Sequence, residues 1–208
     1  MKKRIIWIVA ALLLISFALW GPIVSNVEQA RYTVIETYGE IEIRDYAPMI
    51  VAETEVAGER KDAIGQGFKV IADYIFGNNR QSNKVAMTAP VMQQPSGKIA
   101  MTAPVMQMAE NSVWKIRFVM PSSYTMATLP IPNNDKVKLR ELPGKRFAVI
   151  QFSGTASQSS IKEHSELLAG FISRQNMAVL SEPIFSFFNP PWTLPFLRRN
   201  EVMLEISR

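Results

Sequence analysis

Two hydrophobic periodicities alternate along this chain and predict a mixture of strands and helices. Residues 32–46 alternate polar and apolar side chains and are interrupted at Tyr38-Gly39, which is typical of two strands joined by a turn. Further strands are expected over 49–56 and 113–120, where the same alternation returns. The first half of the chain is therefore rich in strands.

Helical spacing interrupts this pattern twice. Within 61–76 the apolar residues recur every three or four positions, which predicts a helix with the apolar stripe Ile64, Phe68, Ile71 and Ile75. Within 159–175 the same spacing predicts a second helix, with Ile161, Leu168, Phe171 and Ile172 on one side.

The second half of the chain has the same order of elements as the first. Strands are expected over 136–142 and 146–154 before the second helix, and over 183–192 and 200–207 after it. The proline-rich connection 121–135 is taken as the midpoint linker. We therefore predict an α+β fold with a pseudo-twofold strand-strand-helix-strand-strand repeat and a mostly antiparallel, barrel-like sheet carrying two helices.

The first thirty residues differ from the rest. Residues 5–24 contain no charged side chain and follow the basic start "MKKR", and about 20 apolar residues span a hydrocarbon core. A cleaved signal peptide is the alternative, but its apolar region is normally shorter. We predict an uncleaved single-pass anchor in 1–30, followed by a domain over 31–208. Positive charge before the span places the N-terminus in the cytoplasm and the domain in the periplasm or outside the cell.

Composition removes several classes of function. The net charge is +5, but three of those charges are Lys2, Lys3 and Arg4, and the later basic residues are mixed with acidic ones. A nucleic-acid binder normally concentrates its basic residues on one face, so no nucleic-acid partner is expected. The chain has no cysteine, which excludes disulfides and thiolate chemistry.

The single histidine, His164, restricts catalysis further. It borders the apolar stripe of the second predicted helix. It is either a functional residue, as an axial haem ligand or a general base, or a residue at the margin of the core whose ring nitrogen reaches a carbonyl. No nucleophile elbow and no glycine-rich phosphate loop is present. We therefore expect a binding protein and no enzymatic activity.

Aromatic and methionine side chains are the chemistry that remains. The chain has eleven methionines, which fill irregular gaps and pack against aromatic rings. In the segment 189–201, Trp192 and Phe196 precede Arg198-Arg199. An aromatic surface beside arginine suits a flat apolar ligand with carboxylates, although the arginines could equally pair with Glu201 or Glu205.

One ten-residue phrase occurs twice, as "KVAMTAPVMQ" over 84–93 and "KIAMTAPVMQ" over 98–107. Two copies are too few for a repeat architecture. Proline in each copy favours an edge or bulged strand. If "QPSG" turns the chain, the copies form a hairpin in which Met87 faces Pro104 and Met101 faces Pro90.

Several motifs, taken together, resemble the SOUL haem-binding proteins. They follow the family's order from about Tyr38 to Ile206 and are "YIFGNN", "KIAMTAPV", "IRFVMPSSYT", "LPIPNN", "FSG" and "NPPW" followed by "RRNEV". The resemblance implies a twisted, barrel-like sheet with two helices and internal pseudo-symmetry, a fold shared with bacterial effector-binding domains. It also implies non-covalent binding of haem or a porphyrin on an apolar patch near the first helix and the sheet.

The resemblance transfers to individual residues unevenly. Gly65 and Asp73 stand where relatives have basic residues thought to face the haem propionates. The cofactor contacts expected here are Phe68, Met87, Met101, Phe188, Trp192 and Arg198, with His164 as the candidate axial ligand. The alternative function is binding of another amphipathic small molecule or a protein partner, without haem.

Overall fold

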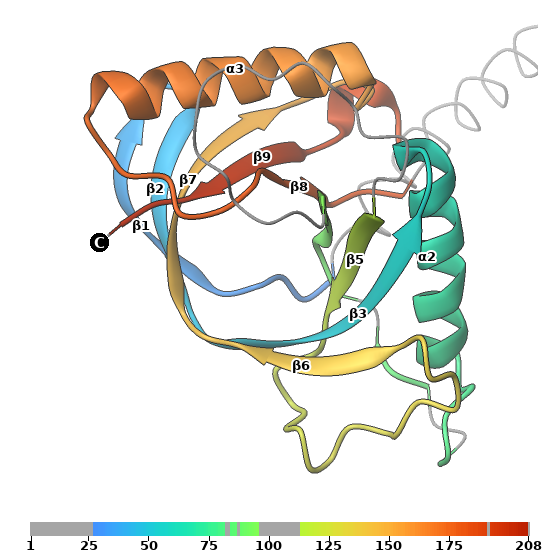
Figure 1. Cartoon of the computed structure of the whole chain (residues 1–208). Helices are drawn as coiled ribbons and strands as arrows, with labels where there is room; N and C mark the ends of the chain where they lie inside the picture. Colours follow the sequence, from blue (N-terminus) through green and yellow to red (C-terminus); the bar gives the residue numbers. More distant parts are fainter. Residues whose placement is uncertain (1–26, 82–83, 87, 96–112, 191, 208) are drawn as a thin grey trace, which may run out of the picture.

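The computed structural model describes residues 27–81, 84–86, 88–95, 113–190 and 192–207, which form one nine-stranded antiparallel sheet with two helices (Figure 1). The sheet curls into a half-barrel, with α3 along one side and α2 along another. The strands are β1 Tyr32–Tyr38, β2 Ile41–Tyr46, β3 Met49–Ala57, β4 Val91–Pro95, β5 Val113–Val119, β6 Lys138–Leu142, β7 Lys145–Phe152, β8 Ile184–Phe187 and β9 Asn200–Glu205. The helices are α2 Arg60–Ile75 and α3 Gln158–Arg174, with a short 3-10 turn η1 at Pro195–Leu197.

The sheet order shows the predicted pseudo-symmetry. The strands lie in the order β1-β2-β7-β9-β8-β4-β5-β3-β6. Around the junction of β8 and β4, the unit β7-α3-β8-β9 matches β3-α2-β4-β5. The strand that precedes each unit in the chain pairs with the other unit. β2 precedes β3 but pairs with β7, and β6 precedes β7 but pairs with β3. The α+β class and the antiparallel half-barrel are thus confirmed, and β1 is an addition outside the repeat.

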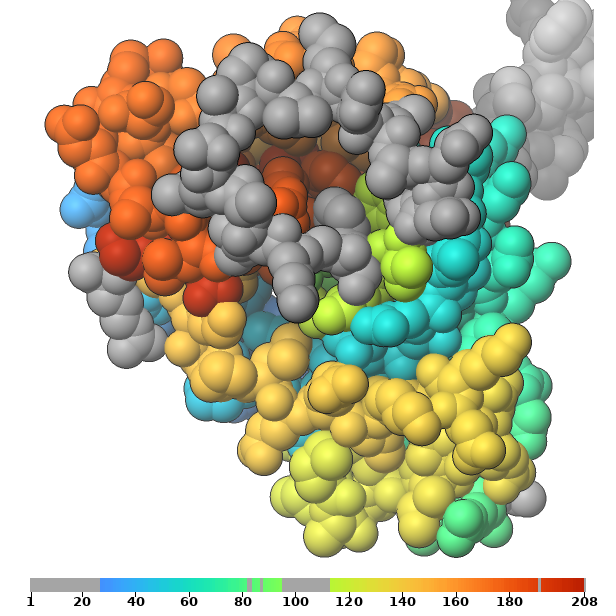
Figure 2. All heavy atoms as spheres, viewed as in Figure 1, coloured from blue at the N-terminus to red at the C-terminus, as the bar shows by residue number. Residues whose placement is uncertain are grey.

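Each face of the sheet has its own core, because neighbouring side chains of a strand point to opposite faces. On β5, Ile116 and Phe118 pack against α2, and on β7, Ala148 and Ile150 pack against α3. The opposite face carries a third buried cluster, built around Tyr46, Val51, Met92, Phe147, Val149, Ile184 and Met203. Figure 2 shows the same view as spheres, with α3 along the upper edge and β6 in the lower part.

The predicted linker 121–135 is part of this packing. Leu129 and, just beyond the linker, Val137 are buried against α2, and the Tyr74 hydroxyl donates to the carbonyl of Pro130 at 2.8 Å. Burial raises the pKa of Tyr74 to about 12, so this phenol remains a neutral donor.

The apolar stripe of α3 is confirmed, since Ile161, Leu168, Phe171 and Ile172 are all buried. The stripe of α2 is rotated from the prediction. Ile71 and Ile75 are buried as predicted, together with Ala63, Gly67 and Tyr74. Phe68 is 39% exposed, and its ring is tilted by 57° against that of Phe118. The small Gly67 allows the helix to approach Ile116 closely, and this contact sets which face is buried.

The predicted hairpin of the doubled phrase is wrong for the residues that the structure describes. Val91, Met92 and Gln93 pair with β5 on one side and with β8 on the other, so no edge remains for the second copy. The strand begins after Pro90, which lets the proline precede an interior strand without breaking its ladder. Met87 and the second copy, including Met101, lie outside the described residues.

The predicted anchor over 5–24 also lies outside the described residues. Within the described part of the chain, neither helix is long and apolar enough to cross a membrane.

Replacing Gly67 with alanine should destabilise the domain. A Cβ atom there would lie 2.8 Å from the Cδ1 and Cγ1 atoms of Ile116, and such overpacking costs about 1–3 kcal/mol. Gly65→Ala on the same helix is the matched control, because a Cβ there meets nothing within 4 Å and should raise the free energy of unfolding by about 0.5–1 kcal/mol. Urea denaturation of both variants compares them directly, and equal effects would contradict the close approach.

Candidate functional site

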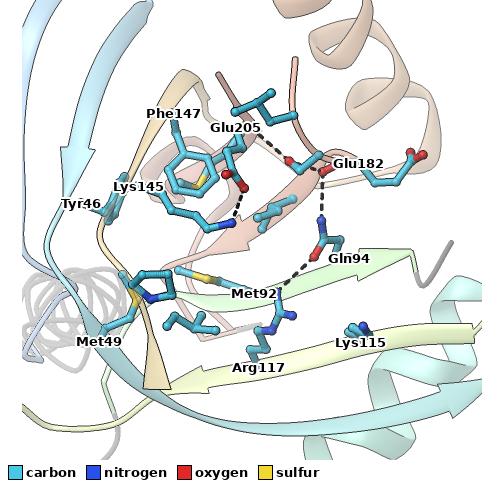
Figure 3. A pocket seen from close by; sticks show the side chains of 16 residues that line it. Tyr46, Met49, Met92, Gln94, Lys115, Arg117, Lys145, Phe147, Glu182 and Glu205 are labelled. Atoms are coloured by element: carbon cyan, nitrogen blue, oxygen red, sulfur yellow. Dashed lines mark hydrogen bonds and ion pairs between the residues drawn. The ribbon is translucent and has the colours of Figure 1, made fainter. Parts of the chain in front are cut away.

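A pocket of about 310 Å³ opens on the face of the sheet that points away from both helices (Figure 3). Its side chains come from the eight strands β2 to β9 and from the segments beside them. The apolar lining consists of Tyr46, Met49, Met92, Leu142, Pro143, Phe147, Leu180, Ile184 and Met203. Methionine and aromatic side chains together form an adaptable apolar surface.

The rim of the pocket is polar and carries three cations. Lys145 donates to Glu205 at 2.6 Å, and Arg117 donates to Gln94 at 3.1 Å (Figure 3). Arg117 also donates to Glu53 at 2.7 Å. Lys115 is 3.5 Å from Glu55, and both side chains are substantially exposed. Exposed pairs at such distances contribute little, so Lys115 is the rim cation least committed to the fold.

A buried ionic cluster supports the pocket from one side. The Glu201 carboxylate is fully buried and accepts from Arg44 at 2.9 Å and from Arg199 at 2.6 Å. Arg44 also donates to the Tyr46 hydroxyl at 3.3 Å, and Arg199 donates to Tyr32 at 3.1 Å. Burial, with Glu201 nearby, raises the pKa of Tyr46, so its phenol stays neutral in the pocket wall.

Comparison with known sequences identifies the domain. A family model described as SOUL heme-binding protein matches residues 27–205. The chain belongs to the SOUL haem-binding family. No curated protein matches its sequence.

Solved structures share the fold of this SOUL domain at low sequence identity. The EcmrR C-terminal domain matches with a TM-score of 0.61 and 10% identity, over 85% of this chain and 98% of that one. An uncharacterized conserved protein from Listeria innocua matches with a TM-score of 0.56 and 12% identity, over 81% and 92%. A hydrolase from Listeria innocua matches with a TM-score of 0.52 and 9% identity, over 83% and 94%. At these identities the likeness shows the fold alone.

His164 lies on the helix face of the SOUL domain and not at the pocket. Its ring stacks on Phe152 with 4.0 Å between ring centroids, and its Nδ1 atom is 2.7 Å from the carbonyl oxygen of Ser160. This is the arrangement expected of a histidine at the core margin, the second of the two readings of the sequence. Its role as an axial ligand stays a prediction.

The remaining predicted contacts lie in two further places. Phe68 lies on an exposed side of α2, while Phe188, Trp192 and Arg198 belong to the connection between β8 and β9. Phe188 is buried beneath the Arg199 guanidinium, at 4.0 Å from its ring centroid, and Arg198 donates to the carbonyl of Thr193 at 2.7 Å. None of the four lines the pocket, and their contact with a tetrapyrrole stays a prediction.

The residues that line the pocket were not picked out from the sequence. A signal was present, since the alternation over 113–120 puts Lys115 and Arg117 on one face of the strand, and Met92 belongs to the doubled phrase. What brings these three together is the pairing of β4 with β5, which places Met92 opposite Arg117. That pairing joins segments that no local pattern connects.

A tetrapyrrole fits this pocket in part. The methionine and aromatic lining suits the edge of a macrocycle, and Lys115 is available to a carboxylate. The volume is at the lower end of the roughly 300–1,000 Å³ of ligand pockets, so the rest of such a ligand would lie in the open mouth. The lining is mainly apolar, so the pocket fits a ligand held mainly by apolar contact.

Replacing Glu201 with glutamine should strongly destabilise the domain. The change removes the buried carboxylate that Arg44 and Arg199 share and leaves Arg44 only its contact with the half-exposed Glu42. Removing one partner of a buried ion pair costs about 3–5 kcal/mol. Glu42→Gln is the control, because Glu42 contacts the same Arg44 at 2.6 Å but its side chain is 30% exposed, and it should cost less than about 1 kcal/mol. Denaturant titration followed by circular dichroism measures both, and similar losses would show that Glu201 is not the centre of the cluster.

Proposed function

We propose that this protein binds haem or a related tetrapyrrole non-covalently, as a binding protein without catalytic activity. Membership of the SOUL haem-binding family over residues 27–205 is the observation that carries the proposal. Bound haem brings its own iron chemistry, and the protein would supply a surface and an orientation for it.

The pocket on the open face is the proposed binding site. Met92 and Phe147 would contact the macrocycle, because they form adjacent parts of the apolar lining. Lys115 would contact a propionate, because its pairing with Glu55 is weak and easily exchanged. The two other rim cations would remain with Glu53 and Glu205 and keep the rim in place.

Titration of the full chain in detergent with haemin tests the proposal. We expect a saturable change of the Soret band, and Lys115→Glu should raise the dissociation constant by about threefold to tenfold. Lys162→Glu is the matched control, since Lys162 has a similarly loose contact with Glu166, at 3.8 Å, but lies on α3 on the other face of the sheet. An equal effect of the two variants would place the ligand elsewhere, and no saturable change in the wild type would exclude haem.

His164→Ala separates the pocket from the predicted axial ligand. If the pocket holds haemin, the spectrum should be unchanged, because His164 lies on the opposite face beside Phe152. A shifted or lost Soret band would show ligation at α3 and contradict the pocket assignment.

A second candidate function is the binding of another amphipathic molecule. The near balance of charge at the rim favours it, because three cations face Glu182 and Glu205 within the lining and Glu53 and Glu55 just beyond it. A ligand with one or no charge would fit this rim as well as a dianion does. Native mass spectrometry of protein purified from its own host would reveal such a ligand by its mass, without haem.

We also propose that residues 5–24 anchor the domain to a membrane, with the N-terminus in the cytoplasm and the domain on the far side. The uncharged span supports this. Gln29 accepts from Arg199 at 3.3 Å and follows the span by five residues, at most about 17 Å. The nearby connection carries exposed Trp192 and Phe196, 57% and 71% accessible, and tryptophan is common at membrane interfaces.

A cysteine-free chain makes the orientation easy to test. Leu180→Cys places one thiol at an exposed site of the domain. A membrane-impermeant maleimide should label this thiol in cells whose outer barrier is opened while the cytoplasmic membrane stays intact. Labelling only after complete lysis would show that the domain lies in the cytoplasm, which is the opposite orientation. Alkaline carbonate should leave the protein in the membrane fraction, and a paired Leu13→Arg and Leu14→Arg change should release it.

A further inference from the structure

Three side chains with polar atoms, the buried Gln93 and the half-buried Arg60 and Trp114, surround one aromatic ring on the helix face of the sheet. The Cζ atom of Arg60 lies 5.8 Å from the centroid of Phe185, and the Trp114 ring centroid lies 6.5 Å from it. Gln93 is directly opposite Phe185 in the ladder between β4 and β8. Arg60 begins α2, so the group brings together one helix and three adjacent strands of the sheet.

All three side chains have buried polar atoms without a hydrogen-bond partner in the described part of the chain. These atoms are Nε of Arg60, Nε1 of Trp114, and both amide atoms of Gln93, whose residue is only 2% exposed. Among the described residues six side chains have such atoms, so half of them gather around this single ring. Buried polar groups in native proteins are nearly always satisfied, and such a concentration therefore needs an explanation.

The chemistry of the unpartnered atoms defines what would satisfy them. The Arg60 and Trp114 nitrogens are donors only, and the Gln93 amide supplies a further donor. Burial lowers the pKa of Arg60, and in the described part of the chain no ion pair offsets this cost. An acceptor with a single negative charge, such as a carboxylate, suits donors of this kind and would neutralise the cation.

The surroundings favour a flat aromatic body attached to that carboxylate. Phe185 and Trp114 provide ring faces and edges, and Phe187 follows on the same face of β8. A phosphate dianion suits the group less well, because it brings a larger charge into an apolar setting that offers one cation.

We propose that Arg60, Gln93 and Trp114 form a binding site for an aromatic carboxylate, separate from the pocket on the open face. The two sites lie on opposite faces of the sheet, because Gln93 points to the helix side and its neighbours Met92 and Gln94 line the pocket. The site does not depend on haem, since its donors and its aromatic neighbours belong to the helix face alone.

Calorimetric titration of the full chain in detergent with 2-naphthoate tests the site. We expect saturable binding, and 2-naphthamide, which lacks the charge, should bind at least about tenfold more weakly. Arg60→Met and Gln93→Met keep the size of each side chain and should each weaken naphthoate binding by about tenfold or more. Arg80→Met is the control, because Arg80 is an exposed cation elsewhere, and it should leave binding unchanged. Unchanged affinity in Arg60→Met would overturn the proposal.

Stability without ligand gives an independent readout. If the polar groups wait for a ligand, both methionine variants should raise the thermal midpoint of the ligand-free protein, because an unsatisfied buried group is removed. A lower midpoint in both variants would show that the fold itself satisfies these groups and would overturn the site.

The haemin titration distinguishes this site from the proposed function. Haemin and 2-naphthoate should bind to the protein at the same time, each at its own site. Arg60→Met should leave haemin binding intact while naphthoate binding is lost. Displacement of one ligand by the other would contradict separate sites. Absence of haemin binding with naphthoate binding retained would remove the proposed function alone.

Discussion

The short ladder between β4 and β8 is the contact on which the rest of the domain depends. Three residue pairs, from Val91–Phe187 to Gln93–Phe185, join two units that each have their own helix and core. Because side chains alternate across a sheet, this register also decides what each face receives. Met92 enters the lining of the pocket, whereas Gln93 enters the polar group beside Phe185. A shift of one residue would exchange the two, so both candidate sites depend on the same register.

Local patterns predicted the elements well because each depends on its own residues. Periodicity and turn residues predict the strands β2 and β3 and the helix α3. They also predict that the two halves have the same order of elements. The strand β4 was misplaced because its prolines suggested an edge, while its actual position is set by β5 and β8. Phe68 was expected to be buried with Ile71, but the contact of Gly67 with Ile116 turns it outward. Such contacts join residues far apart in the sequence, and no local pattern contains them.

The candidate sites were harder to predict than the fold for a related physical reason. A pocket lined by eight strands requires the complete sheet order, and an unsatisfied donor is recognised only when all its neighbours are known. The family resemblance correctly predicted the class of the domain. It pointed to residues on α2 and in the β8–β9 connection, whereas the described pocket lies on the other face. Membership of a family gives the class of the domain, whereas the ligand and its place have to be argued from the site itself.

The exchanged strands β2 and β6 have a consequence for how the chain acquires its structure. Ile41 pairs with Ile150, and Met49 pairs with Leu142, so each half completes its sheet with a strand from the other. Contacts that span roughly 100 residues make folding slow, because loop closure must precede the gain from pairing. The first half cannot finish its sheet while the second is still being synthesised. Until β6 has been synthesised, the edge of β3 that β6 covers is open to pairing with another strand.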